Sequence, residues 1–307
     1  MTLKENQIVI VSIFLVILNA LATVTMSLFA KLLCLHFGAS EVVFLRNSFA
    51  FIALALWLMF SGNLRILKTK RPFAHIVRGA IGTAGIVFGT TALSMMPLAE
   101  TTILFLTWPL FVVLLSYPIL REPVSLYEIL AALIGFLGIA ITTNPSSDID
   151  TLPTLGIILG LCWGLSAAGV NLSLRWLGRT ENSTSTVFYF LLFGIATTGL
   201  HLPFAAMPES GFTLNIFWII AGVGTATLCG QLSKTQGHRM AKASILAPFG
   251  YTTIIWSMLY DYLMWNRLPG IHVIIGASLI VGSNLFILYK KSNSRRQTTV
   301  TKNQQNS

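Results

Sequence analysis

Charge is rare in the long apolar stretches of the sequence, and Arg46, Arg78, Glu100 and Glu122 are among the ionisable side chains that lie in or beside them. A charge at the centre of a bilayer costs roughly 2.5–3.5 kcal/mol or more, so such side chains are expected to pair. Arg46 and Glu100 lie near one end of their stretches, and Arg78 and Glu122 lie near the other. We therefore predict the ion pairs Arg46–Glu100 and Arg78–Glu122, either as structural links or as gates that break when a pathway opens.

A second set of side chains has the chemistry to hold a small polar molecule. Asn19, Thr23 and Ser27 share one helix face because of their spacing. Aromatic faces attract desolvated cations by up to about 2 kcal/mol and also stack on purines. Ordinary helix packing or interhelical hydrogen bonding is the alternative for each residue. The predicted substrate-binding residues are Asn19, Glu100, Trp108, Trp163, Asn171, Tyr189 and Tyr251. Trp163 is expected to stack on the ligand and the amides to orient it.

The sequence contains no spacing that is typical of an enzyme or a metal site. Cys34, Cys162 and Cys229 are isolated and lack the spacing of a metal site or a disulfide framework. No Ser-His-Asp, Cys-His or paired-carboxylate motif is evident, although catalytic groups need not be close in sequence. We therefore predict no catalytic residues, no metal and no cofactor, and we do not expect an enzyme.

The elements that must position these side chains are transmembrane helices. The chain has 307 residues, of which 54% are hydrophobic and 10% are charged, and its mean hydropathy is +0.76. Soluble domains carry about 25% charged residues, and about 20 apolar residues in succession cross a bilayer. We predict an all-α integral membrane protein with ten transmembrane helices, roughly at Ile8–Ala30, Val42–Phe60, Phe73–Leu93, Leu98–Ile119, Leu126–Thr143, Leu155–Leu174, Thr184–Pro203, Leu214–Leu232, Ala243–Leu263 and Ile271–Lys290.

The fourth and fifth stretches form a helical hairpin that recurs in the second half of the chain. Glu122-Pro123 supplies its turn, because proline disfavours helix in the residue before it. A shift of 144 residues places Glu122 on Asn266 and aligns other polar and glycine positions. Five helices per half give the halves opposite orientations, as in the inverted repeats of secondary transporters; chance similarity between apolar sequences is the alternative. The predicted divisions are residues 1–145, residues 146–290 and a polar cytoplasmic tail without regular structure at 291–307.

The distribution of basic residues predicts the orientation. Most of the 20 Lys and Arg residues fall on the side of the N-terminus when the ten stretches alternate. Because basic loops stay in the cytoplasm, we expect both termini there and a multi-pass position in the cell membrane, with a bacterial inner membrane as the expected compartment. The net charge of +10 then reflects topology, and we expect no nucleic acid partner. The expected partners are the lipid bilayer and a small-molecule substrate, with the chain as a monomer or homodimer.

Short motifs in both halves resemble one known family. They are Pro72, His75, Val77-Arg78-Gly79, Pro97-Leu98-Ala99-Glu100, Pro109-Leu110-Phe111 and Glu122 in the first half, and Ala247-Pro248-Phe249, Tyr251-Thr252, Pro269, Gly276 and Ile280 in the second. The chain resembles the drug/metabolite transporter superfamily, EamA type, and within it the branch that contains S-adenosylmethionine uptake transporters of intracellular bacteria. That branch typically has acidic residues at the positions of Asn266 and Gly270, which are neutral here.

The resemblance implies a secondary transporter that moves a small polar metabolite by alternating access. The shift of 144 residues pairs Asn19 with Trp163 and Ser27 with Asn171, which predicts a central cavity between the halves. The expected substrate is S-adenosylmethionine or a related adenosyl or amino-acid compound. Exchange is the expected mode, because no carboxylate is clearly placed at mid-depth to carry a proton. The alternatives are an exporter of amino acids or amines, a membrane-embedded enzyme, and a non-transporting scaffold or channel.

Overall fold

The structure, a computed structural model, describes residues 3–62, 64–120, 125–143, 152–177, 181–200, 202, 213–240, 246 and 249–305. These residues are predominantly helical and none of them lies in a β-strand, so the predicted all-α class is confirmed. The elements are α1 (Leu3–Leu33), α2 (Ala39–Phe60), η1 (Leu64–Leu67), α3 (Pro72–Met95), α4 (Leu98–Phe105), α5 (Trp108–Leu120), α6 (Leu126–Thr142), α7 (Thr154–Leu177), α8 (Ser183–Gly199), α9 (Leu214–Met240), α11 (Thr252–Trp265) and α12 (Ile271–Gln305).

Local sequence determines where several helices begin. Lipid offers no hydrogen-bond partner to a bare backbone, so an apolar segment satisfies its own N–H and C=O groups as a helix. At the start of α6, Glu128 Oε2 lies 2.9 Å from both the backbone nitrogen and the hydroxyl of Ser125, which is part of a capping box. At the start of α8, the side chain of Asn182 accepts a 3.0 Å hydrogen bond from the N–H of Thr184. These polar caps separate neighbouring apolar stretches.

The fourth predicted stretch, Leu98–Ile119, is two helices. α4 ends at Phe105, α5 begins at Trp108, and Pro109 follows directly. Proline has no N–H to donate and its ring clashes with the preceding turn of a helix. The Thr107 hydroxyl instead donates a 2.6 Å hydrogen bond to the carbonyl of Leu104. The prediction of one continuous helix is therefore wrong at this point.

The second half also departs from the sequence prediction in two places. α11 begins at Thr252 with Tyr251 as its N-cap, whereas residues 241–245 and 247–248, including Pro248, lie outside the described residues. α12 continues to Gln305 through the tail for which the sequence predicts no regular structure. Lys, Arg and Gln are good helix formers, and an established helix extends at little cost.

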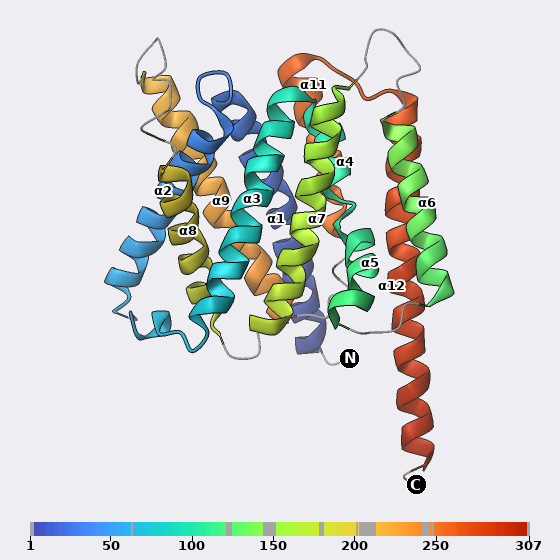
Figure 1. The fold of residues 1–307 in the computed structure, drawn as a ribbon. Helices are drawn as coiled ribbons and strands as arrows, with labels where there is room; N and C mark the ends of the chain where they lie inside the picture. Colours follow the sequence, from blue (N-terminus) through green and yellow to red (C-terminus); the bar gives the residue numbers. More distant parts are fainter. Residues whose placement is uncertain are drawn as a thin grey trace.

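Figure 1 shows a bundle in which helices from the two ends of the sequence lie side by side. α1 packs most extensively against α9, α3 against α7, α2 against α8, and α6 against α12. The start of α1 and the end of α12 both lie at the bottom of Figure 1. We call this the lower end of the molecule and the opposite end the upper end.

Glycines bring some helices into backbone contact. A Cβ on Gly138 of α6 would stand 2.8 Å from the carbonyl oxygen of Gly276 on α12. A Cβ on Gly164 of α7 would stand 3.1 Å from the carbonyl oxygen of Leu104, beside the break between α4 and α5. Small residues at such crossings let membrane helices approach closely and gain dispersion contacts.

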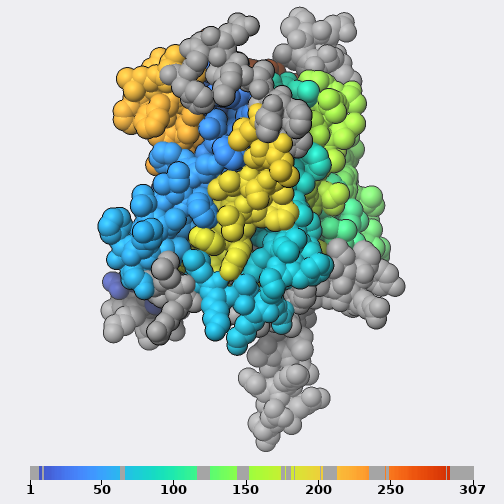
Figure 2. Space-filling model, turned by 60° about the vertical axis from the view of Figure 1, so that its left-hand side comes forward, coloured from blue at the N-terminus to red at the C-terminus, as the bar shows by residue number. Residues whose placement is uncertain are grey.

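The surface and the helix lengths are those of a multi-pass membrane protein. Among the described residues, six helical segments are long and apolar enough to cross a bilayer. α6, α8 and the first part of α12 are shorter apolar helices. Large apolar side chains such as Phe60, Leu133 and Trp218 are more than half exposed on the helix surfaces, as expected where lipid is the solvent. Figure 2 shows one such face, where α8 lies between α2 and α3.

Candidate functional site

Four charged side chains gather at the upper end of the molecule. Lys31 lies in the last turn of α1, Glu100 in the first turn of α4, Asp261 on α11, and Arg267 on the loop between α11 and α12. We call these residues the upper charged cluster. They carry two positive and two negative charges, so the cluster is balanced, which limits the free-energy cost of its burial.

Asp261 ties α11 to α4. Its carboxylate accepts hydrogen bonds from the N–H groups of Leu98, at 3.1 Å, and Ala99, at 2.7 Å. Pro97, the N-cap residue of α4, has no side chain that caps the helix. A carboxylate at this position satisfies exposed N–H groups and interacts favourably with the helix dipole. The cap of α4 therefore comes from a helix more than 150 residues further along the sequence.

Lys31 links α1 to the same end. Its ammonium group donates a 2.6 Å hydrogen bond to the carbonyl of Met96, just after α3, and lies 4.9 Å from the centre of the Trp265 ring. Earlier on α1, the Thr25 hydroxyl is 2.8 Å from the Tyr260 hydroxyl of α11. Helices α1, α4 and α11 are therefore bonded to one another at the upper end.

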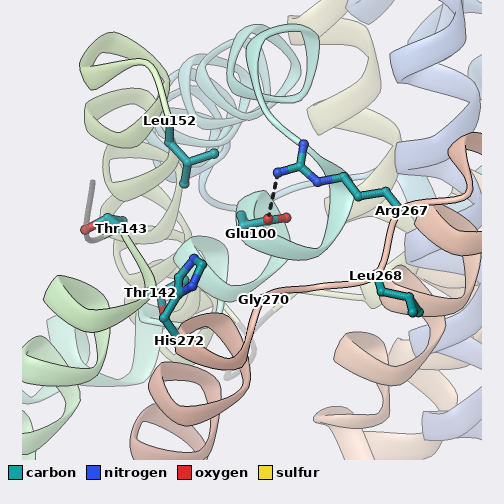
Figure 3. A pocket seen from close by; sticks show the side chains of 8 residues that line it. All are labelled: Glu100, Thr142, Thr143, Leu152, Arg267, Leu268, Gly270 and His272. Atoms are coloured by element: carbon teal, nitrogen blue, oxygen red, sulfur yellow. Dashed lines mark ion pairs between the residues drawn. The ribbon is translucent and has the colours of Figure 1, made fainter. Parts of the chain in front are cut away.

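A small pocket opens beside the ion pair between Glu100 and Arg267. The two groups are 3.6 Å apart, and the exposed fractions of their side chains are 5% and 37%. Figure 3 shows Arg267 reaching across to Glu100 at one side of the pocket, with His272 and Thr142 at the other. The pocket encloses about 340 Å³ including its open part, but the centre of a water molecule has only about 20 Å³ in which to move. This is room for one or two waters, so the pocket is too narrow for a metabolite.

The predicted pair Arg46–Glu100 is not formed. Arg46 Nη1 lies 3.3 Å from Met26 Sδ on α1, and Arg46 Nε has no hydrogen-bond partner. Glu100 pairs instead with Arg267 from a loop. Position along a stretch predicts the depth of a residue but not the direction in which it faces, which explains the error. The second predicted pair, Arg78–Glu122, includes Glu122, which lies outside the described residues.

Aromatic and amide side chains surround the break between α4 and α5. The Trp163 ring of α7 lies 4.3 Å from the Phe105 ring, centre to centre, at an interplanar angle of 35°. Asn284 of α12 is buried and donates a 3.4 Å hydrogen bond to the carbonyl of Leu106 within the break. Tyr251 packs against the same apolar core as Phe105. The break therefore places backbone and amide groups among aromatic side chains of the core.

The other predicted binding residues lie elsewhere or bond locally. Trp108 begins α5 and is half-buried. Asn171 donates a 2.8 Å hydrogen bond to the carbonyl of Ala167 in its own helix. Asn19 faces α9, where a Cβ on Gly230 would stand 3.6 Å from the amide oxygen of Asn19. Of the seven predicted residues, only Glu100 lines the pocket of Figure 3.

Tyr189 belongs to the lower end of the molecule. Its hydroxyl donates a 2.8 Å hydrogen bond to the carbonyl of Leu67 in η1, and its ring lies 4.8 Å from that of His75. The imidazole of His75 lies 3.5 Å from the carboxylate of Glu181. Tyr189 and Glu100 therefore lie at opposite ends, and the structure does not bring all seven predicted residues into one site.

Glu181 is held as a carboxylate by its neighbours at the lower end. Burial raises its pKa, but hydrogen bonds outweigh this effect and lower the pKa below its ordinary value. The backbone N–H of Lys70 donates one of them, at 3.0 Å, and the side chains of His75 and Thr69 contribute the others. The carboxylate thus fastens the loop before α8 to the loop before α3.

Sequence reasoning missed four members of the upper end and the break: Lys31, Asp261, Arg267 and Asn284. Lys31 and Arg267 both lie at stretch ends on the side that is otherwise poor in basic residues, and this exception was a usable signal. Asn284 is a lone amide in the last apolar stretch, and it resembles many amides that only link helices. Its contact with the Leu106 carbonyl depends on how α12 packs.

Comparison with known proteins finds one family model in the first half of the chain and transporters that are similar over most of its length. Residues 10–144 match the EamA-like transporter family. The chain is 28% identical over 272 residues to an S-adenosylmethionine uptake transporter of Rickettsia felis, covering 87% of this chain and 89% of that protein. It is 26% identical to a riboflavin transporter of Brucella anthropi, covering 80% and 86%, and 29% identical to a pseudopaline exporter of Pseudomonas aeruginosa, covering 79% and 84%.

A solved crystal structure shares the fold along its full length. It superposes with a TM-score of 0.58 at 18% identity, covering 94% of this chain and 97% of the other. The helical architecture, the lipid-facing surface, the family match and these relatives agree with one another. Residues 10–144 match the EamA-like transporter family, and most of the chain is similar to transporters of the drug/metabolite transporter superfamily.

Proposed function

We propose that the protein is a secondary transporter whose two inverted five-helix halves move a small polar metabolite by alternating access. The observation that carries the proposal is a symmetry in the helix packing. A shift of 144 residues brings α1, α2, α3 and α6 into register with α7, α8, α9 and α12. Under this exchange the packing of α1 on α9 becomes that of α7 on α3, and the pairs α2–α8 and α6–α12 map onto themselves. A twofold relation between inverted repeats has this property.

The two helix interruptions support the same relation. The break between α4 and α5 falls at Leu106 and Thr107. The shift carries these positions to Gly250 and Tyr251, directly before the start of α11. Paired interruptions in corresponding parts of the two halves point to a substrate site near the bilayer midplane. Trp163 and Phe105 lie beside the first interruption.

The upper charged cluster supplies the gate in this proposal. Its members join α1, α4, α11 and the loop before α12, so these elements separate only when those bonds break. The lower end is the cytoplasmic one, with both termini, in a bacterial inner membrane. In the described state the upper side is closed, and the substrate exchanges with the cytoplasm.

S-adenosylmethionine or a related adenosyl or amino-acid compound is the proposed substrate, moved by exchange. The Rickettsia relative named for uptake of this compound aligns over most of both chains. The Trp163 and Phe105 rings suit a sulfonium cation and an adenine ring.

Export of an amino acid or amine is the second candidate. It is favoured by the pseudopaline exporter among the relatives. It is also favoured by neutral residues at two positions where the S-adenosylmethionine branch typically has acids. Asn266 ends α11 in a left-handed conformation, and Gly270 lines the pocket of Figure 3. Both positions lie on the loop that carries Arg267.

Counterflow in proteoliposomes tests the proposal. The purified chain is reconstituted with unlabelled S-adenosylmethionine inside, and uptake of the labelled compound is followed against protein-free vesicles. We expect transient accumulation of label, competition by S-adenosylhomocysteine, and little competition by nucleosides lacking the amino-acid group. A channel equilibrates the label without accumulating it, and an enzyme alters the labelled molecule. Absence of accumulation with adenosyl compounds, amino acids and amines alike refutes the transport proposal.

A further inference from the structure

Three polar side chains are buried where α2, α3 and α8 meet. Asn47 is 0% exposed, Thr83 is 5% exposed and Arg78 is 6% exposed. Within the described part of the chain, both polar atoms of the Asn47 amide, the Thr83 hydroxyl, and Nε and Nη1 of Arg78 have no hydrogen-bond partner. We call these three residues the buried polar cluster. Figure 2 shows the face that the three helices form together, with α8 between α2 and α3.

Glycines hold the three groups close to one face of α8. A Cβ on Gly194 of α8 would collide with the Asn47 amide nitrogen and would stand 3.4 Å from the Thr83 hydroxyl. A Cβ on Gly82 of α3 would stand 2.7 Å from Arg78 Nη1 and 2.9 Å from the ring of Phe190. Phe190 and Gly194 are about one helical turn apart on α8, a rise of about 6 Å. The guanidinium therefore lies about one turn from the amide and the hydroxyl.

Among the described residues, no acid balances the charge of Arg78. No ion pair of the described residues includes Arg78. The guanidinium lies 4.4 Å from the centre of the Phe190 ring, a contact worth about 0.5–2 kcal/mol. Burial of an ion costs several kcal/mol, which exceeds that gain. A buried guanidinium in this setting attracts an anion.

We propose that the buried polar cluster binds the carboxylate of the transported metabolite. Arg78 pairs with the carboxylate, and Asn47 and Thr83 hold an amine or hydroxyl group next to it. A guanidinium presents a planar fork of N–H donors that fits two carboxylate oxygens. The amide oxygen of Asn47 accepts from an ammonium group, and the hydroxyl of Thr83 both donates and accepts. The ligand class is a molecule with an amino-acid group.

The position of the cluster suits a transported ligand. The inference rests on the proposed function, because α2 and α3 belong to one predicted half and α8 to the other. Thr83 lies midway along α3 (Pro72–Met95). Transporters built from inverted repeats bind their substrates at this depth between the halves. The cluster is therefore distinct from the pocket of Figure 3, which none of its residues lines.

Matched pairs of compounds that differ only in the carboxylate test the inference. The first pair is S-adenosylmethionine and decarboxylated S-adenosylmethionine, and the second is methionine and methylthiopropylamine. For the purified full-length chain in detergent, the concentration giving half-maximal thermal stabilisation is measured for each compound. Counterflow of the same compounds is measured separately in proteoliposomes.

Arg78→Gln is the principal variant, and Arg46→Gln is its matched control. We expect wild type to prefer the carboxylated member of at least one pair by about tenfold or more, the scale of a hydrogen-bonded charge. Arg78→Gln reduces the preference to about twofold or less, because binding of the carboxylated member alone is weakened. Arg46→Gln removes another buried guanidinium, one that faces Met26 on α1, and leaves the preference unchanged.

Asn47→Asp gives a second variant that does not depend on losing Arg78. The new carboxylate supplies the partner that Arg78 lacks, so the ligand-free protein unfolds at a higher temperature and loses its preference for carboxylated compounds. A lower unfolding temperature would show that the acid is buried without a partner, and would overturn the geometry.

The outcomes separate the site from the transport function. Equal weakening of both members of a pair by Arg78→Gln overturns the site, as does a wild type that no carboxylated compound stabilises. Carboxylate-dependent stabilisation without counterflow upholds the site and refutes transport. Counterflow with an unchanged carboxylate preference in Arg78→Gln upholds transport and refutes the site.

Discussion

Replacing Asp261 by asparagine tests whether a cap from α11 holds α4 in place. Asp261 is 3% exposed, and its carboxylate accepts two backbone hydrogen bonds, at 3.1 Å and 2.7 Å. Asparagine keeps one acceptor oxygen and turns an NH₂ group towards N–H donors. Hydrogen bonds to charged groups contribute about 1.5–3 kcal/mol each, and a helix cap about 1 kcal/mol. We therefore expect Asp261→Asn to lower the free energy of unfolding by about 2–3 kcal/mol.

Glu128→Gln provides the matched control for this substitution. Glu128 also places a carboxylate at a helix start, but its partner is Ser125 of the same capping box. Glutamine also fits a capping box, so the control should lose only about 0.5 kcal/mol. Thermal unfolding of both variants in detergent measures the difference. If Asp261→Asn is no less stable than Glu128→Gln, the cap does not join α4 to α11.

Cys34 reports whether the same substitution opens the upper end. It follows α1 directly, and burial raises its pKa to about 11. At pH 7 only about one thiol in 10,000 is then a thiolate, the form that reacts with maleimide. Opening the upper end in Asp261→Asn should lower this pKa and speed labelling by about tenfold or more. The assay uses a background with Cys162 and Cys229 replaced by alanine, and an unchanged rate would exclude the upper charged cluster as a gate.

Three further substitutions test other parts of the structure. Gly276→Ala should lower the free energy of unfolding by about 1–3 kcal/mol, because the new Cβ would stand 2.5 Å from the carbonyl oxygen of Gly138. An unchanged unfolding temperature would show that α6 and α12 lie further apart. The pKa of Glu181 in the folded protein lies below the ordinary value of 4.5, so its contribution to stability is present above that pH and is lost as the pH falls through the lowered value. Unfolding temperatures between pH 6 and 3 should therefore fall more steeply in wild type than in Glu181→Gln, and parallel curves would contradict the assigned hydrogen bonds. Glu100→Gln should keep counterflow within about twofold of wild type. The pair of Glu100 with Arg267 is partly exposed, and such pairs contribute about 1 kcal/mol or less. Flux that is driven by a pH gradient alone and abolished by this variant would refute exchange.

The helical architecture was predictable because bilayer thickness constrains sequence directly. A stretch such as Leu214–Leu232 is long and apolar enough to be recognised without a structure, and α9 begins at Leu214. Capping residues such as Ser125 and Asn182 mark helix starts locally. The family was also recognisable, because its motifs are short and contiguous. The break before Pro109 had a local cause in proline, but apolar composition concealed it.

The candidate site was less predictable, because facing direction and partner choice depend on packing between distant segments. The sequence alone determined that Arg46, Arg78 and Glu100 lie in or beside membrane helices. Only the tertiary structure placed Arg267 beside Glu100, Asp261 at the start of α4, and Arg78 on Phe190. A residue's depth follows from its position in one helix, whereas its partner depends on the rotation of that helix and the path of every loop. Hydrophobic patterning in lipid constrains the depth of a residue strongly and the choice of its partner hardly at all.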